Sequence, residues 1–206
     1  MTLVVAGDVN PAEVEKQVAK TWGKATGKAP RARRRESGFN QPLARAKQFQ
    51  DARNFSVNAI KWVGAIPACN LLDPVLPALD VSAMVLGQGD ASRLYRRLFR
   101  DEGLVTNVGA GVWAPAGTGM YSFDVEAPLD KAGAFRKILS EEVTRFCNEG
   151  PTVEELERAK VAVESERIYS TQSMDGLAHR LGYMKNAVGS PYFDVEYLSK
   201  VQNLTR

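Results

Sequence analysis

Residues 105–128, VTNVGAGVWAPAGTGMYSFDVEAP, decide the fold of this chain because they read as two β-strands joined by a short turn. The runs VTNVGAGVWAP and GMYSFDVEAP flank Ala116-Gly117, which is the pattern of a β-hairpin. A further strand is predicted at residues 55–67, FSVNAIKWVGAIP, where apolar side chains first alternate and then become continuous. The middle of the chain is therefore expected to form paired strands.

The last third of the chain is expected to be helical. Asp130 is predicted to cap a helix that ends near Gly150, and the order T-V-E-E from Thr152 is a capping box that opens the next helix. An apolar stripe then runs through residues 156–184, and Ser190-Pro191 starts a final helix. Paired strands followed by paired helices predict an α+β two-layer domain, with a mainly antiparallel sheet packed against helices.

Before the sheet, residues 2–9, TLVVAGDV, read as a strand. Asn10 and Pro11 then start a helix that ends at Gly23. Residues 24–42 are rich in Gly, Pro, Lys and Arg, which predicts a linker or long loop. The basic run RARRRE in this loop is expected to be solvated.

Composition argues against several classes of function. A net charge of +3 on 206 residues gives no global field that would favour nucleic acid. No apolar run approaches the roughly 20 residues that span a bilayer. Cys69 and Cys147 lack CxxC spacing, His179 is the sole histidine, and neither HExxH nor HxxEH occurs. We therefore expect neither a metal site nor a cofactor site in this chain.

Residues 86–105, LGQGDASRLYRRLFRDEGLV, place a glycine-rich turn before a short helix rich in arginine. The segment GQGDASR lacks the lysine of a Walker loop, and Ser92 stands where a dinucleotide fingerprint has its third glycine. The glycines are instead expected to form a turn, with Asp90 capping the helix that follows.

This short helix is predicted to have an apolar and a basic face. At ~100° per residue, one arc holds Ala91, Leu94, Tyr95, Leu98 and Phe99. The opposite arc holds Arg93, Arg96, Arg97 and Arg100. We expect the first arc in the core and the second solvated or salt-bridged, as a candidate contact face. Nucleic-acid binding would need aromatic side chains beside the arginines, whereas the aromatic side chains of this helix are expected to point into the core.

Several stretches of the chain together resemble one protein family. These are GDVNPAEVEKQVAKTWG, LGQGDASRLYRRLFRDEGLVTNVGAGV, GPTVEELERAK and HRLGYMKNAVGSPYFDVEYLSKVQNLT. In this order, over nearly the whole chain, they resemble the non-nucleophilic repeat domain of the pitrilysin/insulinase zinc metallopeptidases. The resemblance implies an α+β repeat, two or four of which enclose a chamber that holds an unfolded peptide. It also implies that zinc sits on another repeat, in an HxxEH motif, so zinc is expected in the parent protein and not here.

The resemblance also implies where catalytic groups would stand. In the family, one later repeat supplies an arginine and, seven positions on, a tyrosine, which bind the substrate backbone and stabilise the oxyanion. Anchoring that motif on Gly103-Leu104 puts Phe99 at the arginine position and Thr106 at the tyrosine position. Phe cannot donate a charged hydrogen bond, and Thr is too short to replace a phenol. Arg100 is adjacent but points about 100° away on a helix.

The leading interpretation is a non-catalytic domain of a pitrilysin-like zinc metallopeptidase that shapes the peptide-binding chamber. The alternative is a catalytically dead scaffold or assembly subunit of the same family, and a weaker third reading is an autonomous basic binding module. Under the leading interpretation, the expected partners are other repeats of the same chain or a homologous subunit, together with a peptide substrate. Nucleic acid is not an expected partner.

Residues 1–206 are expected to be one repeat excised from the middle of a longer peptidase. The first residues begin at full strand strength, and Thr205 is a natural N-cap followed only by Arg206. An HxxEH repeat is expected upstream and further repeats downstream. Exported bacterial relatives with four repeats suggest a periplasmic parent protein.

Overall fold

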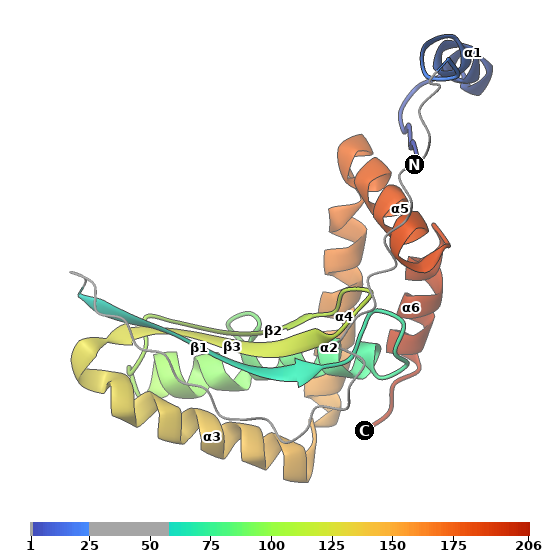
Figure 1. Ribbon diagram of the computed structural model, residues 1–206. Coiled ribbons are helices and arrows are strands. Elements are labelled where there is room, and N and C mark those ends of the chain that lie inside the picture. The colour runs from blue at the N-terminus through green and yellow to red at the C-terminus, as the bar shows by residue number, and fades with distance from the viewer. Residues whose placement is uncertain (1, 25–57) are drawn as a thin grey trace.

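A computed structural model describes residues 2–24 and 58–206 of the chain (Figure 1). The elements are α1 (Pro11–Thr21), β1 (Ala59–Ala68), α2 (Leu76–Gly87), η1 (Tyr95–Asp101), β2 (Asn107–Trp113), β3 (Gly119–Pro128), η2 (Leu129–Lys131), α3 (Ala132–Glu149), α4 (Val153–Ser170), α5 (Met174–Val188) and α6 (Phe193–Gln202). An antiparallel sheet packs against helices, which confirms the predicted α+β class. Residues 25–42 of the predicted loop and residues 55–57 of the predicted strand lie outside the described residues.

The sheet has three strands in the order β1-β3-β2, and both pairings are antiparallel. Strands β2 and β3 form the predicted hairpin, and Glu126 of β3 lies between Lys61 of β1 and Asn107 of β2. Along β3, Tyr121 and Phe123 are buried while Met120 and Asp124 are exposed, as expected of a sheet with one covered face. In Figure 1, α2 and α3 lie below this covered face.

Two clusters of buried side chains form the core. The first lies between the sheet and the elements η1 and α3, where Leu94, Leu98 and Phe135 are fully buried. The second joins α2 to α4, α5 and α6, with Met184 and Val201 fully buried. Helix α2 belongs to both clusters and connects the two-layer body to the helices at its end.

The carboxyl-terminal helices begin and end largely where the local sequence predicts. Thr152 and Glu155 form the capping box of α4, and α3 ends before Gly150, whose φ of 73° suits glycine. The apolar stripe at 156–184 is not one helix, because Ser173 caps a new helix by accepting from the Gly176 N–H. The predicted Asp130 cap is wrong. A 3-10 turn precedes α3, and the cap position has no side-chain hydrogen bond.

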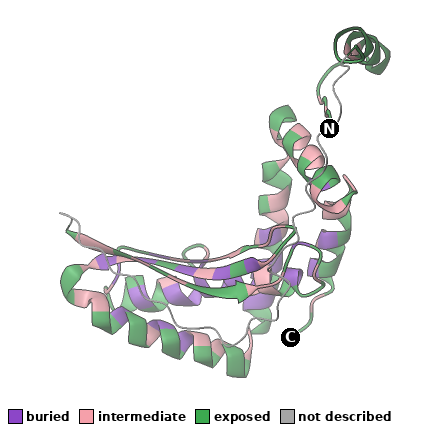
Figure 2. Ribbon diagram, in the orientation of Figure 1, coloured by how far each residue is buried: buried purple, intermediate pink, exposed green. Residues whose placement is uncertain are grey.

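The amino-terminal segment stands apart from the sheet (Figure 1). The start of α1 at Asn10 and Pro11 is confirmed, but α1 buries no residue (Figure 2). The strand predicted at residues 2–9 is not formed, because a strand needs a paired neighbour and these residues pair with no described strand. They contact α5 instead, where the Thr2 hydroxyl donates to Asn186 Oδ1 at 3.1 Å.

Candidate functional site

The helix after the glycine turn is a π-helix, η1, and its side chains are not arranged as 100° spacing predicts. The predicted turn is formed, with Gly89 at φ 75° and the Ser92 N–H donating to the Gly89 carbonyl at 3.1 Å. The predicted Asp90 cap is wrong, since η1 has no side-chain cap. Within η1 the Glu102 N–H reaches the Arg97 carbonyl, five residues back, at 3.1 Å.

Phe99, predicted to be buried, has 40% of its surface exposed. The core beside η1 is filled by Leu94 and Leu98, so Phe99 stacks on the outer side of half-buried Tyr95, with ring centroids 4.7 Å apart. Ala91, also predicted for the core, is exposed. The prediction failed because it assumed the ~100° per residue of an α-helix, and the wider turn of a π-helix does not keep this spacing.

Thr106, which the resemblance predicts at the family's tyrosine position, is turned toward its own sheet. Its N–H and its hydroxyl both donate to the Glu126 carbonyl, at 2.7 and 3.1 Å. Phe99 and Thr106 thus have different partners on different elements. Phe99 has no polar side-chain atom, and the Thr106 hydroxyl donates to backbone.

The four arginines of the predicted basic face separate into two groups. Arg96, Arg97 and Arg100 are exposed, as predicted, and Arg97 pairs with Glu102 at 3.1 Å. Arg93 is buried, with 7% of its surface exposed, so its predicted place on the outer face is wrong. Burial of this charge is tolerated because a carboxylate and a carbonyl meet it.

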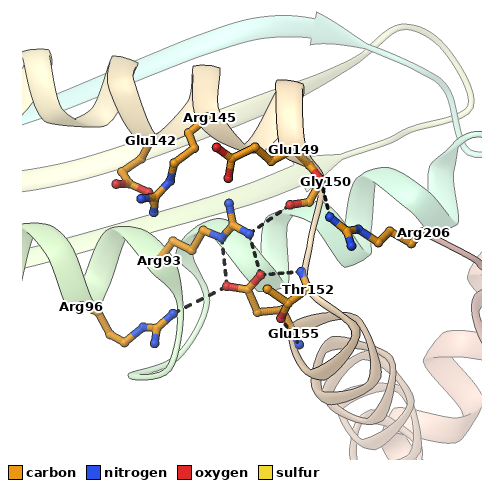
Figure 3. A network of polar contacts seen from close by, with 9 residues as sticks. All are labelled: Arg93, Arg96, Glu142, Arg145, Glu149, Gly150, Thr152, Glu155 and Arg206. Carbon is orange, nitrogen blue, oxygen red and sulfur yellow. Dashed lines mark hydrogen bonds and ion pairs between the residues drawn. The ribbon is translucent and has the colours of Figure 1, made fainter.

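Arg93 is the centre of a polar network at the junction of α3 and α4 (Figure 3). Its Nε donates to Glu155 Oε1 at 2.9 Å, and its Nη2 donates to Glu155 Oε2 at 2.6 Å and to the Gly150 carbonyl at 3.0 Å. The guanidinium also lies over the Phe146 ring, 5.3 Å from its centroid. One side chain, two residues before η1, therefore binds both the end of α3 and the start of α4.

The charge state of Glu155 reflects these contacts. The hydrogen bonds from Arg93 are the main reason that the pKa of Glu155 falls from 4.5 to about 2, against the opposing effect of burial. The Thr152 N–H, which donates to Oε2 at 2.8 Å, lowers this pKa further. The same pair raises the pKa of Arg93. Arg93 and Glu155 are therefore both charged at neutral pH, and this pair fixes the junction of the two helices.

The contact between Arg93 and Glu155 could not be predicted from the sequence. The capping box already accounts for Glu155, and nothing in the spacing of Arg93 and Glu155, 62 residues apart, signals that they meet.

The sheet presents an open face opposite its helices. Its side chains alternate with the buried ones, and Val63, Trp113 and Met120 on it are 65%, 58% and 41% exposed. Gly111 adds a bare position, where a Cβ would meet nothing within 4 Å. We define the open sheet face as Lys61, Val63, Ala65, Gly109, Gly111, Trp113, Met120, Ser122, Asp124 and Glu126. Outer β1 and β2 edges have no strand partner among the described residues.

The described ranges contain neither a cluster of metal ligands nor a membrane-spanning helix. Across residues 2–24 and 58–206, no group of three His, Cys, Asp or Glu side chains is placed to hold a metal ion. His179 is exposed on α5, and Cys69 and Cys147 are free thiols. Zinc therefore has no ligand set in this part of the chain. No helix in the same ranges is long and apolar enough to cross a membrane.

Comparison with known proteins assigns the fold to a family. A family model described as the peptidase M16 inactive domain matches residues 1–163, which is most of the chain. The chain belongs to this family. Its resemblance to a non-catalytic repeat of zinc metallopeptidases is thereby confirmed. A comparison with curated proteins finds no match.

Solved structures share the fold of this M16 inactive domain. A protease from Helicobacter pylori has a TM-score of 0.77 at 18% identity, over 97% of this chain and 48% of that one. A peptidase M16 inactive domain from Pseudomonas fluorescens has a TM-score of 0.66 at 21% identity, over 73% and 36%. The periplasmic protease PqqL from Escherichia coli has a TM-score of 0.67 at 13% identity, over 97% and 22%. The chain thus spans less than half of each of these proteins.

Proposed function

We propose that this M16 inactive domain is a non-catalytic repeat of a larger zinc peptidase and that its open sheet face forms part of the wall of a chamber for an unfolded peptide. The face is mixed in polarity and carries exposed apolar side chains that can contact a peptide. Among the described residues, the outer edges of β1 and β2 have no strand partner, and a free sheet edge can bind an extended peptide by strand addition.

Under this proposal, the catalytic residues belong to other repeats. Phe99 and Thr106 stand where the family places its arginine and tyrosine, and neither can stabilise an oxyanion from its observed position. Zinc, together with the remaining catalytic groups, is proposed to belong to another repeat of the parent protein.

The amino-terminal segment supports the presence of partner repeats. Leu3, Val5, Val9 and Trp22 are between 45% and 50% exposed, although their spacing is that of a strand followed by an amphipathic helix. A strand of this kind is stable only against a sheet edge. We propose that residues 2–22 pack on another repeat of the same chain or on a homologous subunit, and that the single repeat proposed for residues 1–206 has its body in residues 58–206.

A substitution at Gly111, where a Cβ would meet nothing within 4 Å, tests the role of the open sheet face. In the parent protein, Gly111→Phe should fill the chamber wall and weaken binding of an unfolded peptide by about tenfold, or ~1.4 kcal/mol, without lowering the melting temperature. Gly117→Phe is the matched control, because a Cβ at Gly117, in the hairpin turn, also meets nothing within 4 Å.

Peptide affinity is measured by fluorescence anisotropy with a labelled unfolded peptide, and cleavage is followed in parallel. Equal affinity in the two variants would show that the open sheet face does not contact the peptide. If the parent protein binds no unfolded peptide and carries no HxxEH repeat, the scaffold subunit is the correct reading.

A further inference from the structure

A pocket of about 300 Å³ lies beside the end of β2, among helices α2, α4, α5 and α6. This volume is at the lower end of the range for small-molecule sites, about 300–1,000 Å³. Exposed Glu166, Ser170 and Tyr183 are among its lining residues, so the pocket opens to solvent there. Its apolar walls are Leu71, Leu76, Met84, Val112, Ala114 and Val163.

Asp80 of α2 is the most desolvated carboxylate of this pocket. Burial is the main cause that raises its pKa, and the hydrogen bond that the Tyr197 hydroxyl donates to Oδ2 opposes this effect. Within the described part of the chain, neither Asp80 nor Glu166 has a basic side chain within 4.0 Å. The pocket therefore contains a half-buried carboxylate with a neutral hydrogen-bond donor and no salt-bridge partner.

The two arginines of the pocket are paired with a carboxylate of α6, although Arg167 also attracts Asp80 and opposes the rise in the pKa of that carboxyl. Arg180 donates to Asp194 of α6, with Nε at 2.7 Å from Oδ2, and Arg167 Nε lies 3.7 Å from Oδ1 of the same carboxylate. Arg167 also lies over the Tyr197 ring, 5.1 Å from its centroid, and its Nε is fully buried. The lining thus holds two carboxylates, Asp80 and Glu166, and two guanidiniums. Because both guanidiniums are already paired with Asp194, which lies outside the lining, the three carboxylates exceed the two arginines by one negative charge.

We propose that this pocket binds the cationic end of an aliphatic chain, an alkylammonium or alkylguanidinium group, with Asp80 as its charge partner. The apolar walls suit the methylene stem, because long cationic side chains bury their stems and keep the charged end near a polar group. The carboxylate of Asp80 supplies a charge-assisted hydrogen bond, and the ring of Tyr183 at the mouth can add a cation–π contact. This site is separate from the open sheet face and does not depend on the peptide chamber.

The same chemistry can come from a free amine or from a lysine or arginine side chain of a peptide. Agmatine and cadaverine serve as free probes, and valerate serves as an anionic probe of similar length. Binding to the 206-residue chain is measured by NMR titration and calorimetry, with millimolar affinity expected for ligands this small. An extended peptide with one lysine, compared with its norleucine counterpart, shows whether a peptide side chain competes with agmatine.

Two variants test the assignment of Asp80. Asp80→Asn keeps an acceptor for the Tyr197 hydroxyl and should weaken agmatine binding by about tenfold or more, the value of a charge-assisted hydrogen bond. Glu166→Lys changes only the exposed mouth, cannot disturb folding through the core, and should also weaken binding by placing an ammonium group at the pocket. Glu154→Gln, exposed on α4 and outside the pocket, is the matched control and should bind agmatine as wild type does.

Absence of saturable binding by both cations, equal affinity in Asp80→Asn, or tighter binding of valerate would each overturn the proposal. Gly111→Phe should leave agmatine binding unchanged, so failure of the peptide chamber and failure of this pocket give different results. Displacement of agmatine by the lysine peptide, but not by its norleucine counterpart, identifies a peptide side chain as the ligand. Binding of the free amines without displacement by the lysine peptide identifies a small molecule.

Discussion

Replacing Arg93 by leucine should destabilise the fold at the junction of α3 and α4. The substitution removes the bonds to both Glu155 oxygens and to the Gly150 carbonyl, at 2.9, 2.6 and 3.0 Å. It leaves a carboxylate that is 7% exposed without its main partner. An unpaired buried charge is far more costly than an exposed one.

The magnitude follows from the pKa of Glu155. The fall from 4.5 to about 2 corresponds to about 3 kcal/mol, at about 1.4 kcal/mol for each pH unit. Breaking a buried pair by removal of one partner costs about 3–5 kcal/mol. The Thr152 N–H and Arg96, 3.6 Å from Oε1, still contact the carboxylate in the variant. We therefore expect a loss of about 3 kcal/mol at neutral pH, at the lower end of that range.

The effect depends on pH with a defined sign. Because the pKa of Glu155 is depressed in the folded state, its stabilisation is complete above about pH 4.5 and is lost as the pH falls toward about 2. Urea denaturation followed by circular dichroism should show a wide gap between wild type and Arg93→Leu at about pH 7, and a much narrower gap near pH 2–3. Arg100→Leu, at an exposed arginine seven residues further on, is the matched control.

A gap of less than about 1 kcal/mol at neutral pH, the range of exposed ion pairs, would refute the burial argument. A gap that is independent of pH would show that Arg93 stabilises through packing on Phe146 and not through the charge of Glu155. The double variant Arg93→Leu/Glu155→Leu should recover part of the loss, since no charge then remains buried.

Other substitutions and a metal assay test the remaining interpretations. Leu98→Ala should cost about 2–5 kcal/mol, whereas half-exposed Phe99→Ala should cost less than Leu98→Ala, and equal urea midpoints would show that Phe99 belongs to the core. Arg100→Ala should change the free energy of unfolding by about 0–1 kcal/mol, and a larger loss would point to a partner that Arg100 requires. The purified chain should retain no stoichiometric zinc after dialysis and should show no chelator-sensitive peptide hydrolysis; either signal would contradict the assignment of zinc to another repeat.

Local signals in the sequence predicted much of the fold. The hairpin, the Asn10-Pro11 helix start and the Thr152–Glu155 capping box depend on residues close together in the chain, and all are present in the structure. Residues 2–9 failed because a strand is completed by a partner, and strand-like composition cannot supply one. Asp130 failed because a 3-10 turn took the place of a capped helix start.

The polar sites were less predictable because they depend on contacts between distant elements. Arg93 was placed on the outer face because its partner, Glu155, lies far away in the chain and already had a capping role. The α-helical arc also misplaced Phe99, since a π-helix cannot be recognised from apolar spacing. The pocket around Asp80 joins four helices and carries no motif, so only the folded chain reveals it.

The hydrogen bond from Arg93 to the Gly150 carbonyl holds the base of a long helix. Helix α4 has 18 residues, about 27 Å at 1.5 Å per residue, and it rises past the end of the sheet to α5 (Figure 1). A rotation of about 10° at its base would therefore carry its far end about 5 Å. Arg93 binds the Gly150 carbonyl, three residues before the first residue of α4 (Figure 3). A small displacement at the base of α4 would thus become a larger one at its far end, where α4 meets α5.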